Sequence, residues 1–415
     1  MHYIRLLRPV SVETTNRRED VLSVLLTITT DLGDSFFSPD EPLALGLTLE
    51  SGGLPGGRGV VLACPADNKS PLQWRAGMRV LKAQLRLREP LPQDKTTVGI
   101  FARSHQSKTP STRPYWRHGY DDPQTELIVP VSVDMVNRKC APVSLRKLPL
   151  PRGDATSKSS DDLALGEDIG ESIARHIWDA GLVTASYLSD SCRSAEIMAN
   201  ILPARRDRLN ILELGCGVGI LGTTIAAIIR DVAASQGTSL VEAHVLLTDV
   251  DEAEERACAN IERAEEVLER RHSNGGGEDE DEEKPRAVRL QYENLDWDDG
   301  RQGKFGPLSA ARAWDFVVLS DCTYNVDSLP ALIGTLSALH SHSSVARAGQ
   351  EDDSCGALET RVILATKPRH ASEEALFGLL EEQGWSHRVV KTIPLPRVNA
   401  EGEVVEIYML EKGKK

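Results

Sequence analysis

The stretch that decides the fold is Leu209-Asn-Ile-Leu-Glu-Leu-Gly-Cys-Gly-Val-Gly-Ile-Leu-Gly-Thr-Thr-Ile-Ala-Ala-Ile-Ile229. It has the pattern of a short apolar strand, a glycine-dense turn and an apolar helix. Gly215, Gly217 and Gly219 lack a Cβ atom, so the main chain can adopt conformations closed to other residues and let a ligand approach closely. The following helix directs its unpaired N–H groups and the positive end of its dipole at that ligand. The pattern therefore predicts a nucleotide-type ligand site.

Acidic residues near these glycines narrow the class of ligand. The spacing is Gly-x-Gly-x-Gly preceded by Glu213, and not the Gly-x-Gly-x-x-Gly of dinucleotide sites. A carboxylate there would repel a pyrophosphate, but it suits a ligand with an ammonium group, such as the amino-acid end of S-adenosylmethionine. A second apolar segment, 245–248, ends in Asp249, where such folds hydrogen-bond ribose hydroxyls. Glycines alone also fit a tight turn without a ligand, but the two acids favour the ligand site.

The charge balance bears on the kind of partner. The 415-residue chain carries a formal net charge of -14. Binding to nucleic acid needs a concentrated basic face, so a general affinity for nucleic acid is not expected. A protein partner with basic or neutral surface fits this balance better.

Cysteine usage and the N-terminal sequence bear on location. The seven cysteines are scattered and never in Cys-x-x-Cys spacing, so neither a zinc site nor a disulfide framework is expected. The N-terminus lacks the apolar core of a signal peptide, and no apolar run approaches the length of a membrane span. We expect a soluble protein without metal or membrane attachment, located in the cytoplasm, with an additional nuclear location left open.

Residues 1–148 alternate between apolar and polar side chains with a period of two. Turns rich in Gly, Pro and Asp separate six expected strands, which are 21–30, 43–49, 59–63, 78–87, 97–102 and 126–133. This predicts a small antiparallel β domain, a candidate for substrate or partner recognition. Residues 149–166 have the composition of a linker.

Residues 167–415 follow a different pattern, which predicts a second domain. A helical period begins at Glu167 and places Ile169, Ile173 and Ile177 on one face, with Trp178 in the same helix. Strands and helices then alternate, which predicts a parallel sheet covered on both faces. The expected elements are strands 211–214, 243–248, 287–292, 314–319 and 361–366 and helices 218–234, 252–271, 327–340 and 372–383. The last two strands, 388–394 and 404–411, have no helix between them and should pair as an antiparallel hairpin.

Two inserts interrupt this domain. The first, 273–286, contains six consecutive acids, Glu278 to Glu283, which repel one another and predict a disordered loop. The second, 341–358, is expected to be a flexible loop.

Five motifs, taken in chain order, resemble those of the family-16 group of seven-β-strand lysine methyltransferases, which modify nonhistone proteins. They are Trp178-Asp179-Ala180, Glu213-Leu-Gly-Cys-Gly-Val-Gly219, Asp249, Leu295-Asp-Trp297 and Ser320-Asp-Cys-Thr-Tyr324. The resemblance implies an α/β fold with a Rossmann-like seven-stranded methyltransferase sheet, preceded here by the smaller all-β domain. It implies S-adenosylmethionine as cofactor, a lysine-bearing protein as partner, and a chain that is monomeric or in complex with its substrate.

The same resemblance assigns cofactor contacts. The methionine end of the cofactor would lie over Gly215 to Gly219 with Glu213 beneath, and Asp249 would hold the ribose. Trp297 would stack near the adenine, Ser320 would join the cofactor-binding residues, and Trp178 would cap the pocket. From the sequence alone, Trp178 fits equally well as a core residue on the apolar face of its helix.

The segment Asp321 to Tyr324 follows the fourth strand, where open α/β sheets present residues to the ligand crevice. Methyltransferases of planar amide or adenine nitrogens usually carry Asn-Pro-Pro-Tyr at this place. The carboxylate of Asp321 suits a lysine ammonium, whose pKa of ~10.4 desolvation would lower, and Tyr324 would line the lysine channel. We therefore assign Asp321 and Tyr324 as catalytic residues, with no metal or covalent intermediate. His370 either contacts substrate or merely leads the next helix.

Two other functions stay open at this point. One is a methyltransferase of a small amine or of another side-chain nitrogen on the same fold. The other is a catalytically silent binding or assembly module that keeps the cofactor fold.

Overall fold

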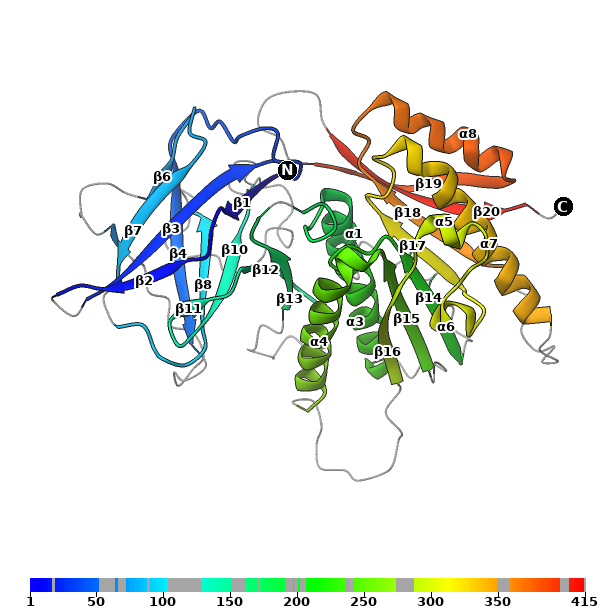
Figure 1. The fold of residues 1–415 in the computed structure, drawn as a ribbon, viewed down its shortest axis with the longest axis horizontal. Coiled ribbons are helices and arrows are strands. Elements are labelled where there is room, and N and C mark those ends of the chain that lie inside the picture. The colour runs from blue at the N-terminus through cyan, green and yellow to red at the C-terminus, as the bar shows by residue number, and fades with distance from the viewer. Residues whose placement is uncertain are drawn as a thin grey trace. The chain divides into compact units, whose positions relative to one another are not determined.

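The computed structural model describes residues 1–16, 19–51, 64–65, 72–87, 90–103, 128–150, 162–170, 172–190, 197, 201, 207–235, 240, 242–273, 287–348, 359–395 and 403–413. The chain divides into two compact units. The first comprises Met1–Leu148, Ala164–Ile173 and Leu395–Gly402, and the second comprises Pro149–Leu163, Ala174–Pro394 and Glu403–Lys415. Figure 1 shows the elements of both units as a ribbon. No helix among the described residues is both long and apolar enough to cross a membrane.

The first unit is built from two β-sheets, as the period-two pattern predicts. One sheet has the strand order β5-β7-β3-β1-β9 with β2 paired to β3, and the other has the order β13-β12-β10-β8-β4-β6 with β11 paired to β10. The strands are β1 (His2–Leu6), β2 (Ser11–Thr14), β3 (Asp20–Thr29), β4 (Leu43–Ser51), β5 (Cys64–Pro65), β6 (Gln73–Trp74), β7 (Leu81–Arg86), β8 (Thr96–Ala102), β9 (Ile128–Val129), β10 (Val131–Val136), β11 (Lys139–Cys140), β12 (Val143–Leu148) and β13 (Leu163–Asp168). Alternate apolar residues of these strands, such as Leu22, Val24 and Leu26, form one buried core. The expected strand 59–63 lies outside the described residues.

Two sequence-based predictions about the start of the second domain were wrong. Residues 163–168 form strand β13 rather than linker or helix, because Leu163 and Leu165 are fully buried and pair the chain with β12. The expected helix from Glu167 begins only at Asp179, as α1 (Asp179–Ser189). Ile173 is 59% exposed, so a helical spacing of apolar residues does not mark a buried face here. The rest of the expected linker, residues 151–161, lies outside the described residues.

The second unit has a seven-stranded sheet in the order β16-β15-β14-β17-β18-β20-β19. Its strands are β14 (Arg208–Leu214), β15 (Glu242–Asp249), β16 (Ala287–Asn294), β17 (Phe316–Ser320), β18 (Arg361–Thr366), β19 (Trp385–Pro394) and β20 (Val404–Lys412). The first five are parallel, and β20 runs antiparallel to both β18 and β19. The expected parallel sheet with a C-terminal antiparallel hairpin is therefore confirmed.

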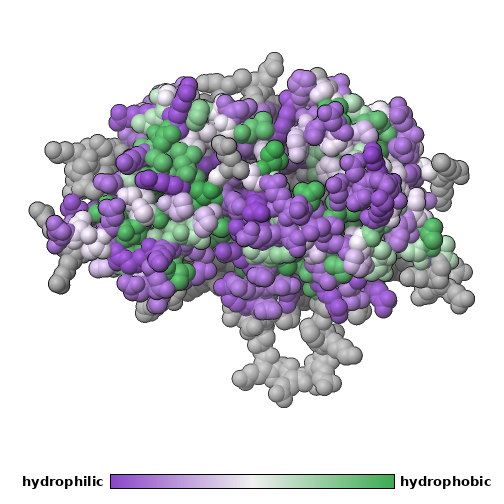
Figure 2. Space-filling view, viewed as in Figure 1, coloured by the Kyte–Doolittle hydropathy of each residue, from purple (hydrophilic) through white to green (hydrophobic). Residues whose placement is uncertain are grey.

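Helices cover both faces of this sheet, and its central strands β14, β15, β17 and β18 are buried over most of their length. In Figure 1, α1, α3 (Ile220–Ser235) and α4 (Asp251–Ser273) cover one face, and α7 (Leu329–Ala348) and α8 (Ala375–Glu382) cover the other. Short helices complete the unit: α5 (Trp297–Gly300), α6 (Pro307–Ala310), η1 (Val326–Ser328) and η2 (Ala371–Glu374). Figure 2 shows hydrophilic side chains over the outward face of α4, whose first turn holds Asp251, Glu252 and Glu254.

The strand order places a ligand crevice at one end of the sheet. From β14 the chain adds β15 and β16 on one side, and it then crosses to β17 and β18 on the other. Open α/β sheets bind ligands beyond the carboxyl ends of the strands at such a switch point. The crevice therefore lies beyond Leu214 and Ser320.

The second insert is shorter than predicted. Helix α7 continues to Ala348, because Ser343 is fully buried and its hydroxyl accepts a hydrogen bond from the Trp314 backbone N–H over 2.9 Å. The predicted flexible loop at 341–358 was thus wrong for 341–348, while 349–358 lies outside the described residues. Residues 274–286, which contain the six consecutive acids of the first insert, also lie outside the described residues.

Candidate cofactor and substrate site

The glycine turn between β14 and α3 has the backbone conformation that the sequence predicts. Gly215, Gly217 and Gly219 have φ angles of 62°, 53° and 80°, in the left-handed region that favours glycine. A Cβ atom on Gly215 would lie 2.6 Å from Sγ of Cys322, and one on Gly219 would lie 2.5 Å from Cδ2 of Leu247. Neither position can accept a side chain without rearrangement.

Glu213 lies beneath this turn as a fully buried carboxyl group. It is 1% exposed, and its Oε2 accepts a 2.9 Å hydrogen bond from the backbone N–H of Gly222 in α3. Burial raises the pKa of Glu213 to about 8, although the bond from Gly222 opposes this shift, and the nearby charge of Asp249 adds to it.

Asp249, at the end of β15, is the second acid of the site. Its Oδ2 accepts a 2.7 Å hydrogen bond from the Gly217 N–H, and its Oδ1 accepts one of 2.7 Å from the Val250 N–H. Each carboxylate oxygen has a further lone pair for a ligand hydroxyl. Burial raises the pKa of Asp249 above its usual value, while these two bonds lower it.

Trp297 opens the short helix α5 and lies against the glycine turn. A Cβ atom on Gly215 would lie 3.0 Å from Cζ2 of its indole. The residue is half-buried and packs against the apolar core cluster that includes Leu332 and Leu336 of α7. Its main chain is fixed by the Thr335 hydroxyl of α7, which donates a 2.9 Å hydrogen bond to the Trp297 carbonyl. A flat ring beside the glycine turn suits a purine.

Asp321 follows β17 in an unusual conformation. Its φ angle is 55°, a left-handed value that a non-glycine residue adopts only when its surroundings hold it there. Oδ2 accepts a 2.8 Å hydrogen bond from the Gly181 N–H in the first turn of α1, and Oδ1 accepts one of 3.3 Å from Nη2 of Arg369. The carboxylate therefore caps α1 and pairs with a guanidinium, which the sequence does not indicate.

Trp178 and Ser320 lie beside this carboxylate. Trp178 is the N-cap residue of α1 rather than part of the helix, and the Arg369 guanidinium lies over its ring at 5.5 Å. The Ser320 hydroxyl lies close to Gly181, where a Cβ atom would come within 3.0 Å of it. The structure thus brings Trp178, Ser320 and Asp321 together at the N-terminus of α1.

The three residues after Asp321 point in different directions. Sγ of Cys322 lies 3.4 Å from the carbonyl oxygen of Leu214, beside the glycine turn. The Thr323 hydroxyl instead donates a 3.0 Å hydrogen bond to Oε2 of Glu373, on the side of η2. Tyr324 is 52% exposed, and burial of the rest of the residue raises the pKa of its phenol. Among the described residues, its hydroxyl has no hydrogen-bond partner.

The structure settles the local role of His370. Its Nδ1 accepts a 3.1 Å hydrogen bond from the Ser372 N–H, and Glu373 accepts bonds from the backbone N–H groups of Arg369 and His370. His370 is therefore the N-cap residue of η2, in agreement with the helix-leading alternative.

Sequence reasoning missed two cations after β18. Arg369 pairs with Asp321, and the buried Nζ of Lys367 lies 2.7 Å from Oδ2 of Asp179 and 3.1 Å from Oε2 of Glu403. The available signal was the segment Lys367-Pro-Arg, which follows an apolar strand whose end faces the crevice.

The glycine turn fits S-adenosylmethionine on the evidence of its own residues. Glu213 is a buried and Asp249 a partly buried carboxyl group, and neither has an ion-pair partner within the described part of the chain. Their pKa values are raised because no cation offsets their burial, and a ligand with a sulfonium and an ammonium group would offset it. The three glycines hold the turn in a left-handed conformation that side chains would strain, so the main chain at this turn stays uncovered by side chains of its own.

The parallel sheet with its antiparallel hairpin, the glycine turn and the two acids define the class of S-adenosylmethionine-dependent methyltransferases with a Rossmann-like fold. Residues 157–383 match the family model described as lysine methyltransferase. This match covers more than half of the 415 residues, and the chain belongs to that family.

The individual proteins that the chain resembles share little sequence identity with it. A UPF0665 family protein of Schizosaccharomyces pombe is 26% identical over 262 residues, which make up 63% of this chain and 59% of the relative. The chain thus matches less than two thirds of that protein. Among solved structures, TYW2 of P. horikoshii in complex with MeSAdo has a TM-score of 0.31 and 11% identity over 68% of this chain and 75% of its own. An S-adenosylmethionine-dependent methyltransferase of Methanosarcina mazei has a TM-score of 0.28 and 12% identity over 52% and 96%. Scores this low carry no argument about substrate.

Proposed function

We propose that this protein is an S-adenosylmethionine-dependent protein N-methyltransferase that acts on the ε-amine of lysine in a nonhistone protein. The observation that carries the proposal is a carboxylate, Asp321, at the end of β17, within a chain of the lysine methyltransferase family. An acid at this place suits an amine that arrives as an ammonium ion, whereas a planar amide would need a neutral hydrogen-bonding group.

The cofactor side of the site is assigned to the residues around the glycine turn. Gly215, Gly217 and Gly219 would receive the amino-acid end, with Glu213 beneath it. The other proposed contacts are Asp249 for the ribose, Trp297 for the adenine, and Ser320 and Trp178 at the N-terminus of α1. When bound, S-adenosylmethionine supplies an electrophilic methyl group.

The substrate side must orient an amine and help it lose one proton. Asp321 can attract a lysine ammonium, and the adjacent Arg369 guanidinium, 3.3 Å from Oδ1, then disfavours the charged form of the amine. The half-exposed Tyr324 offers a ring for the aliphatic part of the lysine and a hydroxyl without a partner among the described residues. Arg369 thus joins Asp321 and Tyr324 as a residue that we expect to affect methyl transfer.

One experiment tests the proposal directly. The purified chain is incubated with S-adenosylmethionine labelled in its methyl group and an extract of its own host, and labelled molecules are separated and analysed by mass spectrometry. We expect a labelled protein that contains methyl-lysine, and no such label with Asp321→Ala. Label in nucleic acid or in small amines alone would contradict the lysine assignment, and no Asp321-dependent label would contradict a catalytic role.

A further inference from the structure

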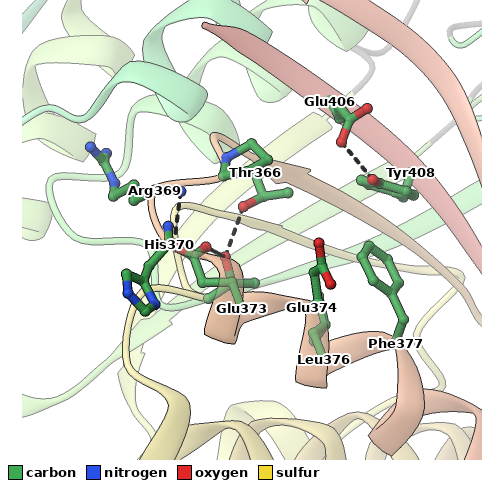
Figure 3. A pocket seen from close by; sticks show the side chains of 11 residues that line it. Thr366, Arg369, His370, Glu373, Glu374, Leu376, Phe377, Glu406 and Tyr408 are labelled. Carbon is green, nitrogen blue, oxygen red and sulfur yellow. Dashed lines mark hydrogen bonds between the residues drawn. The ribbon is translucent and has the colours of Figure 1, made fainter.

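The second unit contains a pocket whose lining residues do not include the glycine turn. It has a volume of about 440 Å³, within the usual range of small-ligand pockets. Its walls come from the loop after β17, the end of β18, the segment η2 to α8, and β20 (Figure 3). The residues that matter below are Thr323, Glu373, Glu374, Phe377, Glu406 and Tyr408.

The position of this pocket relative to the methyl-transfer site follows from two consecutive side chains. Cys322 lies against the glycine turn, with its Sγ 3.4 Å from the Leu214 carbonyl oxygen. Thr323 points to the opposite side, into the pocket, where its hydroxyl bonds to Glu373. The same short loop therefore has one side chain at the glycine turn and the next in the pocket, and Arg369, which lines the pocket and pairs with Asp321, connects the pocket to the proposed methyl-transfer site.

The charges in the pocket are not balanced from within the described chain. The two oxygens of Glu373 already accept bonds from two backbone N–H groups and from Thr323, so this carboxylate is held in place by the chain itself. The partly buried Glu406 accepts a 2.6 Å hydrogen bond from the Tyr408 hydroxyl, and the exposed Glu374 side chain makes no hydrogen bond to the described part of the chain. Among the described residues, neither Glu374 nor Glu406 has a cationic partner, since the lining cation Arg369 is held by Asp321 and Trp178.

Two aromatic rings accompany these two carboxylates. The rings of Phe377 and Tyr408 lie 5.2 Å apart at 50°. Figure 3 shows the Glu374 carboxylate and the Phe377 ring pointing from the same helical segment toward Glu406 and Tyr408 on β20. Carboxylates beside aromatic rings suit a planar guanidinium, which donates paired hydrogen bonds and stacks on rings more readily than an ammonium does.

We propose that this pocket binds an arginine side chain of the protein substrate, near the lysine that is methylated. The inference rests on the proposed function for the identity of the partner, and it adds a recognition element to it: the substrate carries an arginine close enough to span the loop Asp321–Tyr324. The guanidinium lies between Glu374 and Glu406 and against the ring of Phe377.

The test uses the full chain labelled with 4-fluorophenylalanine and a probe that mimics one residue. The chain has six phenylalanines, so the fluorine resonance of Phe377 can be assigned with Phe377→Leu. N-acetyl-arginine methylamide is titrated in, and N-acetyl-citrulline methylamide serves as its neutral counterpart. We expect the Phe377 resonance to shift with the arginine probe, and Glu374→Gln with Glu406→Gln to raise the half-saturation concentration at least tenfold. The amide oxygen that Glu406→Gln introduces can still accept the Tyr408 hydrogen bond, so the fold should be preserved.

The matched control removes two charges from neighbouring exposed positions on α8 and β20. Glu381→Gln with Glu411→Gln should leave the titration unchanged within twofold. An equal response to the citrulline probe, an equal response to N-acetyl-lysine methylamide, or no shift at Phe377 would each overturn the proposal. Because the titration needs neither cofactor nor methyl transfer, a failure of the lysine methylation assay does not affect this readout.

Once the methylated substrate protein has been identified, steady-state kinetics can test whether the pocket serves substrate recognition. With that substrate, the variant Glu374→Gln with Glu406→Gln should have a KM at least fivefold higher and a kcat within twofold of the unchanged enzyme. An unchanged KM would show that the pocket does not serve substrate recognition, even if the probe binds.

Discussion

The backbone N–H of Gly181 donates a 2.8 Å hydrogen bond to Oδ2 of Asp321, 140 residues further along the chain. Trp178, the N-cap residue of α1, has no side-chain capping bond, so Asp321 takes over the role of a capping residue. Its other oxygen holds Arg369. One carboxylate therefore fixes the ends of β17 and β18 relative to the start of α1.

Asp321→Asn keeps the shape of the side chain and removes its charge, so it tests whether the charge contributes to methyl transfer. Asn tolerates left-handed backbone conformations and can still accept the Gly181 hydrogen bond, so Asp321→Asn should keep the fold and the helix cap, while its Nδ2 cannot replace the oxygen that pairs with Arg369. The lost charge should slow methyl transfer by a factor on the order of 100, while the Kd of S-adenosylmethionine changes little. Single-turnover rates and calorimetric titration measure the two effects. Equal rates for Asp321→Asn and the unchanged protein would mean that only the helix cap matters.

Arg369→Gln offers the complementary change. It removes the charge that should favour the neutral acceptor amine, so the pH profile of methyl transfer should move to higher pH. A uniform loss of rate with an unmoved profile would instead indicate a purely structural role.

The sequence predicted the frame of this site but not its internal contacts. The strand at 211–214, the glycine turn and Asp249 follow from local apolar and glycine patterns, and the structure places them as expected. The Asp321–Arg369 pair and the cap on α1 join residues far apart in the chain, and no local pattern records such pairs. Strand β13 was missed for the same reason, because its pairing with β12 depends on the fold of the first unit.

Gly215 offers a direct test of the glycine turn. An alanine there would meet Sγ of Cys322 at 2.6 Å and Cζ2 of Trp297 at 3.0 Å, at a φ angle of 62°. We expect Gly215→Ala to raise the Kd of S-adenosylmethionine at least about tenfold, or ~1.4 kcal/mol, by calorimetric titration. Gly303→Ala is the matched control, because Gly303 has a φ angle of 72° with nothing near its Cβ position. It should show the backbone strain alone and bind the cofactor normally.

The buried Glu213 should make stability depend on pH. Its pKa is raised from 4.5 to about 8 in the folded chain, so between these values the unfolded chain loses a proton that the folded chain keeps. Stability should therefore fall as pH rises from 4.5 to 8, by at most about 1.4 kcal/mol per unit, and then level off. Glu213→Gln keeps an acceptor for the Gly222 N–H and lacks the titration. The difference in unfolding free energy between the two proteins, measured by urea from pH 5 to 9, should show this slope. A flat difference would contradict the raised pKa.

The first unit contains a buried ion pair that should govern its own stability. Nε of Arg146 donates a 2.7 Å hydrogen bond to Oε1 of Glu167 in β13, and both side chains are 2% exposed. Burial lowers the pKa of Arg146, and the Glu167 carboxylate opposes that shift. Arg146→Met would leave Glu167 buried without this partner, at a cost of about 3–5 kcal/mol.

A double variant that removes both charges of the pair shows how much of the lost stability comes from the unpaired Glu167 carboxylate. Arg146→Met with Glu167→Gln removes the buried carboxylate, and the remaining Arg5 guanidinium, 3.9 Å from Oε2 of Glu167, is 14% exposed and reaches solvent, so the double variant should regain more than half of the stability lost in Arg146→Met. Urea unfolding of the full chain, followed by a probe in the first unit, measures both variants. The Kd of S-adenosylmethionine should stay within twofold in each, because the glycine turn belongs to the second unit. If the double variant were less stable than Arg146→Met, hydrogen bonds and packing around Glu167 would outweigh the cost of its unpaired charge.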